Sequence, residues 1–350
     1  MSAKIMIYGA QSIALGAALA VQALYPECRL IGFLVSSLEN NPVRLADLPV
    51  IELHSLKEKD IHVLIATPED THAAIIKLLH EHGITSYTCL DWEKEETLMK
   101  EYYERKGKFP AIQCSQKQEY IAEVYMAKFN KDKPLKTDGG IPDWLIPIQV
   151  GAALTDQKVA DIRDDSGENI SKKNRNYCEL TALYWIWKNR LNAPDCAAYS
   201  GVFHYRRFLN LSDRDMEQMK QEGVDVVLPF PTVHGPDISE HHARYIKEMD
   251  WEAMRQALYE LQPQYAERLQ GILKQPYLYN YNIIVAKKEV LKGYCEWLFP
   301  ILERTEELSN PKGWERADRY IGYLGENLLT LYFLSQKELK IRHVGRKMLV

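Results

Sequence analysis

Short apolar runs alternate with helical patterns over the first 95 residues, and this alternation constrains the fold more than any other feature of the chain. The predicted strands cover residues 4–8, 30–35, 50–53, 62–67 and 87–90, and the predicted helices cover residues 12–24 and 71–82. Strands separated by helices favour a parallel sheet of the Rossmann type. We therefore expect an N-terminal α/β domain over residues 1–95.

The turn after the first predicted strand is similar to the dinucleotide-binding fingerprint but departs from it. Gly9, Gln11 and Ala14 stand where the fingerprint has three glycines, and the second glycine is the one that lets the backbone approach a pyrophosphate. Only Glu39 stands near the place of the usual ribose-binding acid. Gly9 and Gln11 remain candidates for a nicotinamide site, but a structural or regulatory domain is the favoured interpretation.

A second and larger α/β domain is expected after a charged segment. Residues 91–108 (DWEKEETLMKEYYERKGK) predict a solvated helix followed by a linker, and we assign residues 96–118 to this connection. Residues 119–350 again alternate between strand and helix patterns. Strands are predicted at 120–127, 197–204, 224–229 and 281–286, and helices at 174–189, twice within 239–273, at 288–307 and at 315–335.

Composition excludes several classes of function. The chain has 350 residues, 46% of them hydrophobic, and a formal net charge of −4 without a basic tract, so nucleic acid is not an expected partner. Six cysteines are scattered without the spacing of a zinc site or a disulfide framework. No signal peptide and no apolar run long enough to span a bilayer is present. We expect a cytoplasmic protein that works at a membrane only peripherally, at its inner face.

The densest group of polar residues lies between positions 164 and 174. Asp165, Asn169 and Asn174 surround the start of a predicted helix, whose free N–H groups would suit an anion. The same residues are common helix caps and turn formers, which is the competing interpretation. Further along this helix, four residues have helical spacing and are assigned to the core, namely Tyr177, Leu180, Tyr184 and Trp187.

The sequence His204-Tyr205-Arg206-Arg207 directly follows a predicted strand. Functional groups at the carboxyl end of a strand lie where α/β sheets bind ligands, and a guanidinium suits a diphosphate at any working pH. Adjacent residues of a strand point to opposite sides, so we expect one arginine to face the pocket and the other to pair with a carboxylate. A surface ion pair is the alternative.

Several motifs occur together in the second half of the chain. In order, they are PIQVGAAL, DDSGENISKKNRNYCELTALYWIWKN, YSGVFHYRRFL, DVVLPFP, YNYNIIVAKKEVLKGYCEWLFPILE and RYIGYLGENLLTLYF. In this combination, residues 119–350 resemble the domain of unknown function 4422 family. The resemblance implies a GT-A-like glycosyltransferase of bacterial capsular or exopolysaccharide biosynthesis, a family with some links to galactose or galactofuranose transfer.

The resemblance also assigns roles to individual residues. GT-A enzymes usually carry an Asp-x-Asp motif for a divalent metal where this chain has HYRR, so no metal ligand is assigned and a guanidinium or imidazolium would neutralise the diphosphate. Glu326 or Asp318 would act as the general base, although an ion pair between Glu326 and Arg319 is equally compatible with the sequence. The donor-binding candidates are Asp165, Asn169, Asn174, His204, Tyr205, Arg206, Arg207, Asn282 and His343.

The resulting hypothesis is transfer of a hexose from a nucleoside diphosphate donor, such as a UDP-sugar, to a saccharide or lipid-linked saccharide. No further cofactor is assigned. The first alternative is an NAD-binding oxidoreductase or a nucleotide-sensing protein that works through residues 1–95. The second is a non-catalytic scaffold in a polysaccharide assembly complex.

Overall fold

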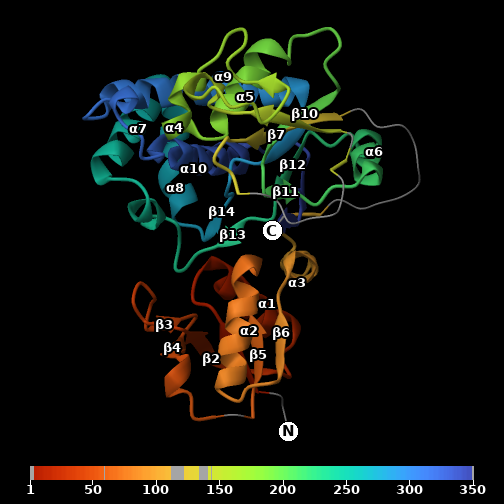
Figure 1. Ribbon diagram of the computed structural model, residues 1–350, viewed down its shortest axis with the longest axis vertical. Coiled ribbons are helices and arrows are strands. Elements are labelled where there is room, and N and C mark those ends of the chain that lie inside the picture. Colours follow the sequence, from red (N-terminus) through yellow and green to blue (C-terminus); the bar gives the residue numbers. More distant parts are fainter. Residues whose placement is uncertain (1–3, 59, 112–121, 134–140, 143, 349–350) are drawn as a thin grey trace.

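Two large β-sheets make up the protein (Figure 1). The computed structural model describes residues 4–58, 60–111, 122–133, 141–142 and 144–348. The sheet formed by the first 89 residues lies at one end of the molecule, and the larger sheet with most of the helices lies at the other (Figure 1). Residues 112–121, which contain the predicted boundary at residue 119 and the start of a predicted strand, lie outside the described residues. The predicted division into 1–95, 96–118 and 119–350 stays a prediction.

The smaller sheet has the predicted parallel α/β architecture. Its strands follow the order β3-β4-β2-β1-β5-β6, and every neighbouring pair is parallel except β3 with β4. The five parallel strands are ordered like those of a doubly wound sheet. Their bounds and those of the helices are β1 (Lys4–Tyr8), α1 (Ser12–Leu24), β2 (Arg29–Val35), β3 (Arg44–Leu45), β4 (Leu48–Glu52), β5 (His62–Ile65), α2 (His72–Glu81) and β6 (Tyr87–Cys89).

Helix α3 (Trp92–Lys106) joins the two parts and differs from the solvated helix that its charge predicts. Asp91 caps its first turn, and Gly107 ends it with a left-handed φ of 63°. One face of the helix is buried, because Met99, Tyr102 and Tyr103 pack against α1 and the segment around β13. The charged residues occupy the opposite face. The high charge of the segment therefore predicted the exposed face of α3 but not its buried face.

The larger sheet is mixed. Its main strand order is β16-β12-β15-β10-β7-β8-β9, and the short β11 and β17 extend it beside β10. Strand β10 lies parallel to β7 but antiparallel to β15. The bounds are β7 (Ala122–Lys128), β8 (Leu145–Gln149), β9 (Ile162–Arg163), β10 (Tyr199–His204), β11 (Arg207–Leu209), β12 (Val226–Pro229), β15 (Ile284–Lys287), β16 (Ile341–Val344) and β17 (Arg346–Met348), with β13 (Thr232–Val233) and β14 (Tyr277–Leu278) forming a separate antiparallel pair.

Helices cover both faces of this sheet. Along β7, Tyr125 packs into the core on one face, while Val124 and Met126 pack into the core on the other. The first core contains residues of α5, α7, α9 and α10, and the second contains residues of α6. The helices are α4 (Asn174–Tyr177), α5 (Leu180–Asn189), α6 (Asp213–Glu222), α7 (Glu248–Leu261), α8 (Pro263–Leu273), α9 (Lys288–Leu308) and α10 (Tyr320–Ser335).

Three elements of the structure have bounds that differ from those predicted from the sequence. The helix predicted at 174–189 is interrupted at Cys178, which has a φ of 52° and a ψ of −130°. The last helix begins at Tyr320 rather than 315, after Arg319 in a left-handed conformation. The strand predicted from 281 begins at Ile284, because Tyr281 and Asn282 have positive φ angles. All three differences lie beside the cleft described below.

The two parts of the chain are tied together by specific hydrogen bonds. The buried hydroxyl of Tyr103 in α3 donates to the carbonyl of Pro231 at 2.9 Å. Also in α3, Glu96 accepts a hydrogen bond from the backbone N–H of Gly345 at 2.9 Å, and Glu95 pairs with Arg346 at 3.0 Å. Helix α3 therefore holds the smaller sheet against the larger one. Within the described residues, no helix combines the length and apolarity that a membrane span requires.

A close backbone approach in the centre of the larger sheet gives a stability prediction. A Cβ atom on Gly201 in β10 would lie only 2.0 Å from the carbonyl oxygen of Ile284 in β15. Gly201→Ala should therefore destabilise the fold by about 1–3 kcal/mol or more, because the central strands would have to separate. Denaturant-induced unfolding measures the change.

Gly271→Ala in α8 is the matched control, since nothing lies within 4 Å of the added Cβ. This substitution should stabilise the protein by about 0.5–1 kcal/mol through helix propensity. Equal unfolding midpoints for the two variants would show that the contact between β10 and β15 does not require glycine.

Candidate active site

A cleft of about 680 Å³ opens at the carboxyl end of β10, beside the first turns of α10. Four described segments of the larger sheet and its helices supply most of its polar side chains: the end of β10, the loop after β7, the break between α4 and α5, and the start of α10. Because β7 and β10 are parallel neighbours, their carboxyl ends meet at one edge of the sheet. This edge is where α/β sheets bind ligands.

The four residues 204–207 form a tight hairpin between β10 and β11. His204 pairs with Arg207 across the hairpin, which leaves Tyr205 and Arg206 as the turn. Both arginines line the cleft. The expectation that they point to opposite sides is wrong, because that rule holds within a strand and Arg206 lies in a turn. Tyr205 lines the cleft as well, with the Arg206 guanidinium 5.4 Å from its ring centroid.

Neither arginine has the carboxylate partner that the sequence led us to expect. No ion pair of Arg206 or Arg207 is found among the described residues. Arg207 lies over the ring of Tyr281 at 4.4 Å, and the buried Nε of Arg206 has no hydrogen-bond partner in the described part of the chain. A desolvated guanidinium donor without a partner favours an anionic ligand.

Two further arginines line the same cleft. Arg319 lies beside the thiol of Cys178, and Arg244 donates to the side-chain oxygen of Gln11 at 3.0 Å. In the described residues, neither forms an ion pair with a carboxylate, so the predicted alternative of an Arg319–Glu326 pair is not observed. Four guanidinium groups therefore converge on one cavity.

The carboxyl groups of the cleft offset this positive charge only in part. Burial raises the pKa of Asp132, which lies in the loop after β7, to about 6. Burial also raises the pKa of Glu179. The pKa of Glu326 rises to about 8, first through burial and then through the nearby charge of Glu179. At neutral pH the cleft is therefore strongly electropositive.

His204 does not add to this charge. Burial, and then the charge of the neighbouring guanidinium groups, lower the pKa of His204 to about 3. Its Nδ1 accepts a long hydrogen bond of 3.4 Å from the backbone N–H of Arg206. The imidazolium suggested from the sequence is therefore not expected, and His204 acts as a neutral hydrogen-bonding group.

Asn282 lies beneath the cleft and orients its acidic residues. The Asn282 side-chain amide donates to Glu179 at 2.7 Å and to the carbonyl of Gly322 at 3.0 Å. Only 2% of Asn282 is exposed, and it is absent from the cleft lining. Asn282 therefore does not line the site for a donor as predicted. It positions Glu179 and Gly322 at the floor of the cleft instead.

Backbone strain gathers at the same floor. Cys178, Tyr281, Asn282 and Arg319 all have positive φ angles, between 49° and 75°. Side chains other than glycine rarely adopt this conformation, and such residues often mark ligand-binding sites. The strain explains why the predicted elements end where they do, since each residue interrupts or precedes a helix or strand.

Other predicted site residues lie elsewhere. Asp165 pairs with Arg163 at 2.7 Å, and Asn169 donates to the carbonyl of Gly167. Asn174 donates to Cys178 and Thr181. None of the three lines the cleft. The predicted anion site at this helix start is also unsupported, because α4 has only four residues. The capping and turn interpretation fits these contacts better.

The remaining two candidates are engaged in structural contacts. His343 is 3% exposed, and its Nε2 lies 2.9 Å from the hydroxyl of Tyr279. Burial lowers its pKa to about 3, so it does not fit the expected phosphate contact. Asp318 accepts a hydrogen bond from Arg316 at 3.0 Å and does not line the cleft. Of the two predicted bases, only Glu326 lies at the site.

The sequence did not reveal several residues of the cleft. Asp132 belongs to a polar loop after β7, a position that could have indicated it. Tyr245 and Tyr323 come from distant segments, and their rings stack with centroids 4.8 Å apart. Tyr245 is 52% exposed. A partly exposed aromatic stack beside polar groups is suited to the apolar face of a sugar ring.

The end of β10 does not present the carboxylate ligands that a divalent metal usually takes. The residues at the end of β10 offer guanidinium, phenol and imidazole groups but no carboxylate. Among the described residues, no three His, Cys, Asp or Glu side chains lie close enough together to hold a metal ion. HYRR therefore stands where the family resemblance led us to expect an Asp-x-Asp motif.

Comparison with known proteins identifies the family of this chain. The profile described as "Domain of unknown function (DUF4422)" matches residues 124–337. The chain belongs to this family. The match covers most of the larger sheet and its helices, including every residue of the HYRR hairpin, and it leaves out β16, β17 and the smaller sheet.

Solved structures add a likeness in fold. The apo structure of the WbbM bifunctional glycosyltransferase has 27% identity and a TM-score of 0.56, over 65% of this chain and 45% of that one. The DUF4422 chain thus spans less than half the length of WbbM. The mannosyltransferase Ktr4p from S. cerevisiae aligns over 75% of this chain and 82% of its own, with 10% identity and a TM-score of 0.28. No curated protein sequence matches.

The unpaired arginines give a binding prediction. Inorganic pyrophosphate should raise the melting temperature of the protein, because the guanidinium groups of the cleft make no ion pair within the described residues. Arg206→Ala and Arg207→Ala should each reduce this shift by more than half in a thermal denaturation assay at low salt.

Arg214→Ala on the exposed surface of α6 is the charge-matched control. It should retain the full shift. Equal shifts in all three variants would exclude the HYRR hairpin as the anion site.

Proposed function

We propose that this protein is a glycosyltransferase that transfers a hexose from a nucleoside diphosphate donor to a saccharide hydroxyl. One observation carries the proposal: four guanidinium groups, which have no carboxylate partner in the described part of the chain, share a cleft with the half-buried carboxyl group of Glu326. The pairing of an anion site with a group of high pKa suits departure of a diphosphate and removal of a proton. Similarity to WbbM, which is named a bifunctional glycosyltransferase, supports the same reaction.

Arg206 and Arg207 would bind the diphosphate. During transfer, the bond between the anomeric carbon and the diphosphate oxygen breaks, and the diphosphate keeps the bonding electrons. The guanidinium groups stabilise the charge that develops there. Because they are fixed by the hairpin and by contact with Tyr205 and Tyr281, they need little rearrangement during the reaction.

Glu326 would accept the proton of the acceptor hydroxyl as the new bond to the anomeric carbon forms. A base with a pKa of about 8 is ionised in part at neutral pH and is strong enough to share that proton. Glu179 raises this pKa, and Asn282 holds Glu179 in place through a hydrogen bond of 2.7 Å. We therefore assign Glu326 as the catalytic base and Asn282 as a positioning residue.

Substrate and pathway are proposed in more detail from the family resemblance. A uridine-linked galactose or galactofuranose is the donor that we propose, and a capsular, exopolysaccharide or other surface glycan is the product. The acceptor is a saccharide, free or linked to lipid, which the enzyme would meet at the inner face of the bacterial membrane. We do not propose a nicotinamide site, since the Gln11 side chain is already bonded to Arg244 and Asn41.

Release of nucleoside diphosphate from UDP-hexoses tests the proposal. Hydrolysis of the preferred donor should proceed equally in EDTA and in manganese, because guanidinium groups supply the positive charge. The Arg206→Ala/Arg207→Ala double variant should lose about 10²-fold or more in kcat/KM.

Failure of every UDP-hexose to release UDP, with and without a saccharide mixture, would reject the proposed reaction. A strict requirement for manganese would retain the transferase but reject the role of the arginines. The Arg214→Ala variant again serves as the control for charge.

The pH dependence of transfer tests the role of Glu326. Because the base must be ionised, kcat/KM should rise about tenfold per pH unit below pH 8 and level off above it. Glu326→Gln should lower the rate about 10²- to 10⁴-fold and remove this slope.

Glu338→Gln, at an exposed position after α10, should keep both the rate and the pH profile of the parent protein. If Glu326→Gln retains the rise towards pH 8, another group is the base.

A further inference from the structure

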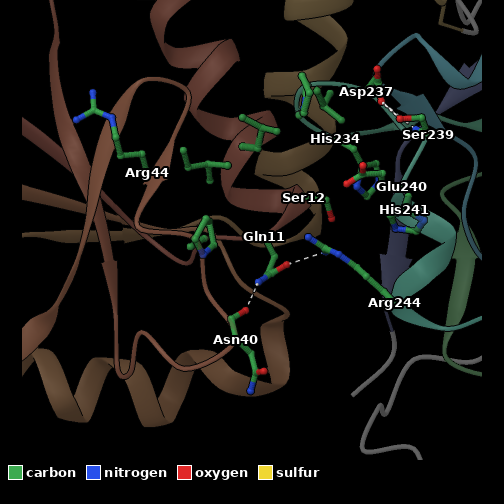
Figure 2. Close-up of a pocket in the computed structure, with 17 residues that line it drawn as sticks. Gln11, Ser12, Asn40, Arg44, His234, Asp237, Ser239, Glu240, His241 and Arg244 are labelled. Atoms are coloured by element: carbon green, nitrogen blue, oxygen red, sulfur yellow. Dashed lines mark hydrogen bonds between the residues drawn. The ribbon is translucent and has the colours of Figure 1, made fainter.

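A second cavity, of about 510 Å³, lies between the two parts of the chain (Figure 2). One wall comes from the start of α1 and from residues 40–45 of the smaller sheet. The opposite wall comes from residues 233–244 of the larger part. This cavity adjoins the cleft, because both are lined by the same five residues, Gln11, Ser12, His234, His241 and Arg244.

Gln11 connects the two walls. Its side-chain oxygen accepts a hydrogen bond of 3.0 Å from Arg244, and its nitrogen donates to the side chain of Asn41 at 3.0 Å. A longer contact of 3.4 Å reaches the carbonyl of Asn40 (Figure 2). The residue that breaks the dinucleotide fingerprint therefore joins the smaller sheet to an arginine of the cleft.

The position of the smaller sheet is fixed by more than this bridge. Helix α3 bonds to Pro231 through Tyr103 and to Gly345 through Glu96. Pro231 precedes the segment that forms the cavity wall. Gly345 precedes β17, which pairs with β11 and so supports the HYRR hairpin. These contacts hold the smaller sheet in place as one wall of the cavity, so its side chains can contact a bound ligand.

The lining combines neutral hydrogen-bonding groups with two arginines and two carboxylates, Arg44, Arg244, Asp237 and Glu240. Gln11, Ser12, Asn40 and Ser239 offer amides and hydroxyls. Burial lowers the pKa of His234 to about 3 and that of His241 to about 4, so both imidazoles are neutral at physiological pH. A neutral imidazole both donates and accepts, as sugar hydroxyls do.

One of these groups lacks a partner. The buried Nδ1 of His241 makes no hydrogen bond within the described residues. Its ring stands edge-on to that of His234, with centroids 4.3 Å apart. A polar ligand in the cavity would satisfy a nitrogen that is otherwise desolvated without compensation.

A dinucleotide fits this cavity poorly. The side chain of Gln11 occupies the approach that a second glycine would leave open for a pyrophosphate. Glu39, the one candidate for a ribose-binding acid, does not line the cavity. The lining therefore favours a ligand with many hydroxyl groups over one with two phosphates.

We propose that this cavity is the binding site for the saccharide acceptor, and that the smaller sheet supplies one wall of it. The inference rests on the proposed glycosyltransferase reaction. The terminal sugar would reach the cleft past Gln11, Ser12 and Arg244, with its attacking hydroxyl towards Glu326, while the preceding sugar units contact Asn40, Arg44 and Ser239.

Two substitutions confined to the second cavity test the proposal. Asn40→Gly removes the amide without strain, since Asn40 already has a φ of 62°. Arg44→Ala removes an exposed guanidinium. Arg29→Ala is the matched control, because Arg29 is an exposed arginine at the start of β2, whereas Asn40 and Arg44 follow the end of that strand. The acceptor is whichever nitrophenyl-linked di- or trisaccharide the wild-type protein glycosylates fastest, because the preceding sugar units are the ones expected to contact Asn40 and Arg44.

The Asn40→Gly/Arg44→Ala double variant should raise the acceptor KM at least tenfold. Its rate of UDP-hexose hydrolysis without acceptor and its thermal shift with UDP should stay unchanged, and Arg29→Ala should match the wild type throughout. An unchanged acceptor KM would overturn the proposal. A reduced thermal shift with UDP would instead make the cavity a nucleotide site. Absence of both hydrolysis and transfer in the wild type would count against the proposed reaction itself.

Discussion

The hydrogen bonds of Asn282 connect the parts of the chain from which the cleft is built. One buried amide joins the segment before β15 to Glu179, at the break between α4 and α5, and to Gly322 in the first turn of α10. These three segments are far apart in sequence, and each contains a residue with strained backbone. Such strain persists only where surrounding contacts determine the conformation, and the bonds of Asn282 are such contacts.

Burial beside the arginines has opposite effects on the acids and the imidazole of the cleft. It raises the pKa of Asp132, Glu179 and Glu326 and lowers that of His204. In each case the low dielectric favours the neutral form. Glu326 and His204 are then largely neutral at pH 7, and the four guanidinium groups remain the dominant charge, because arginine keeps its proton even when desolvated. An electropositive cleft therefore follows from burial and from the choice of arginine, without a metal ligand.

The sequence predicted the architecture well where periodicity carries the information. The parallel α/β sheet of the first 89 residues, the helix at 288–307 and the packing of Tyr177 and Tyr184 were all evident from apolar spacing. The interruption at Cys178 was not, because neither cysteine nor its neighbours signal a positive φ. Tertiary contacts of Cys178 with Arg319 and Gly322 override the helical pattern there.

The candidate site could be predicted only where strand order determines it. The HYRR hairpin follows a central strand, so its place at the ligand-binding edge was accessible from sequence. Asp165, Asn169 and Asn174 have the composition of an anion site, yet their side chains are used in a local ion pair and in local hydrogen bonds to the backbone. Arg244 and Tyr245 enter the cleft from an irregular segment after β13, and no sequence period identifies such a contribution. Composition indicates which groups are present, whereas their partners depend on the fold.

The pairing of β11 with β17 has a consequence for how the protein matures. The strand that follows the HYRR hairpin is completed by residues 346–348, and the adjoining Gly345 is held by Glu96 of α3. A ribosome releases residues 346–348 long after the hairpin itself, and such long-range pairing forms slowly. The arginine hairpin can therefore be completed only when early, middle and late segments of the chain have met. A partly synthesised chain would carry the arginines without the β11–β17 pairing that completes their hairpin.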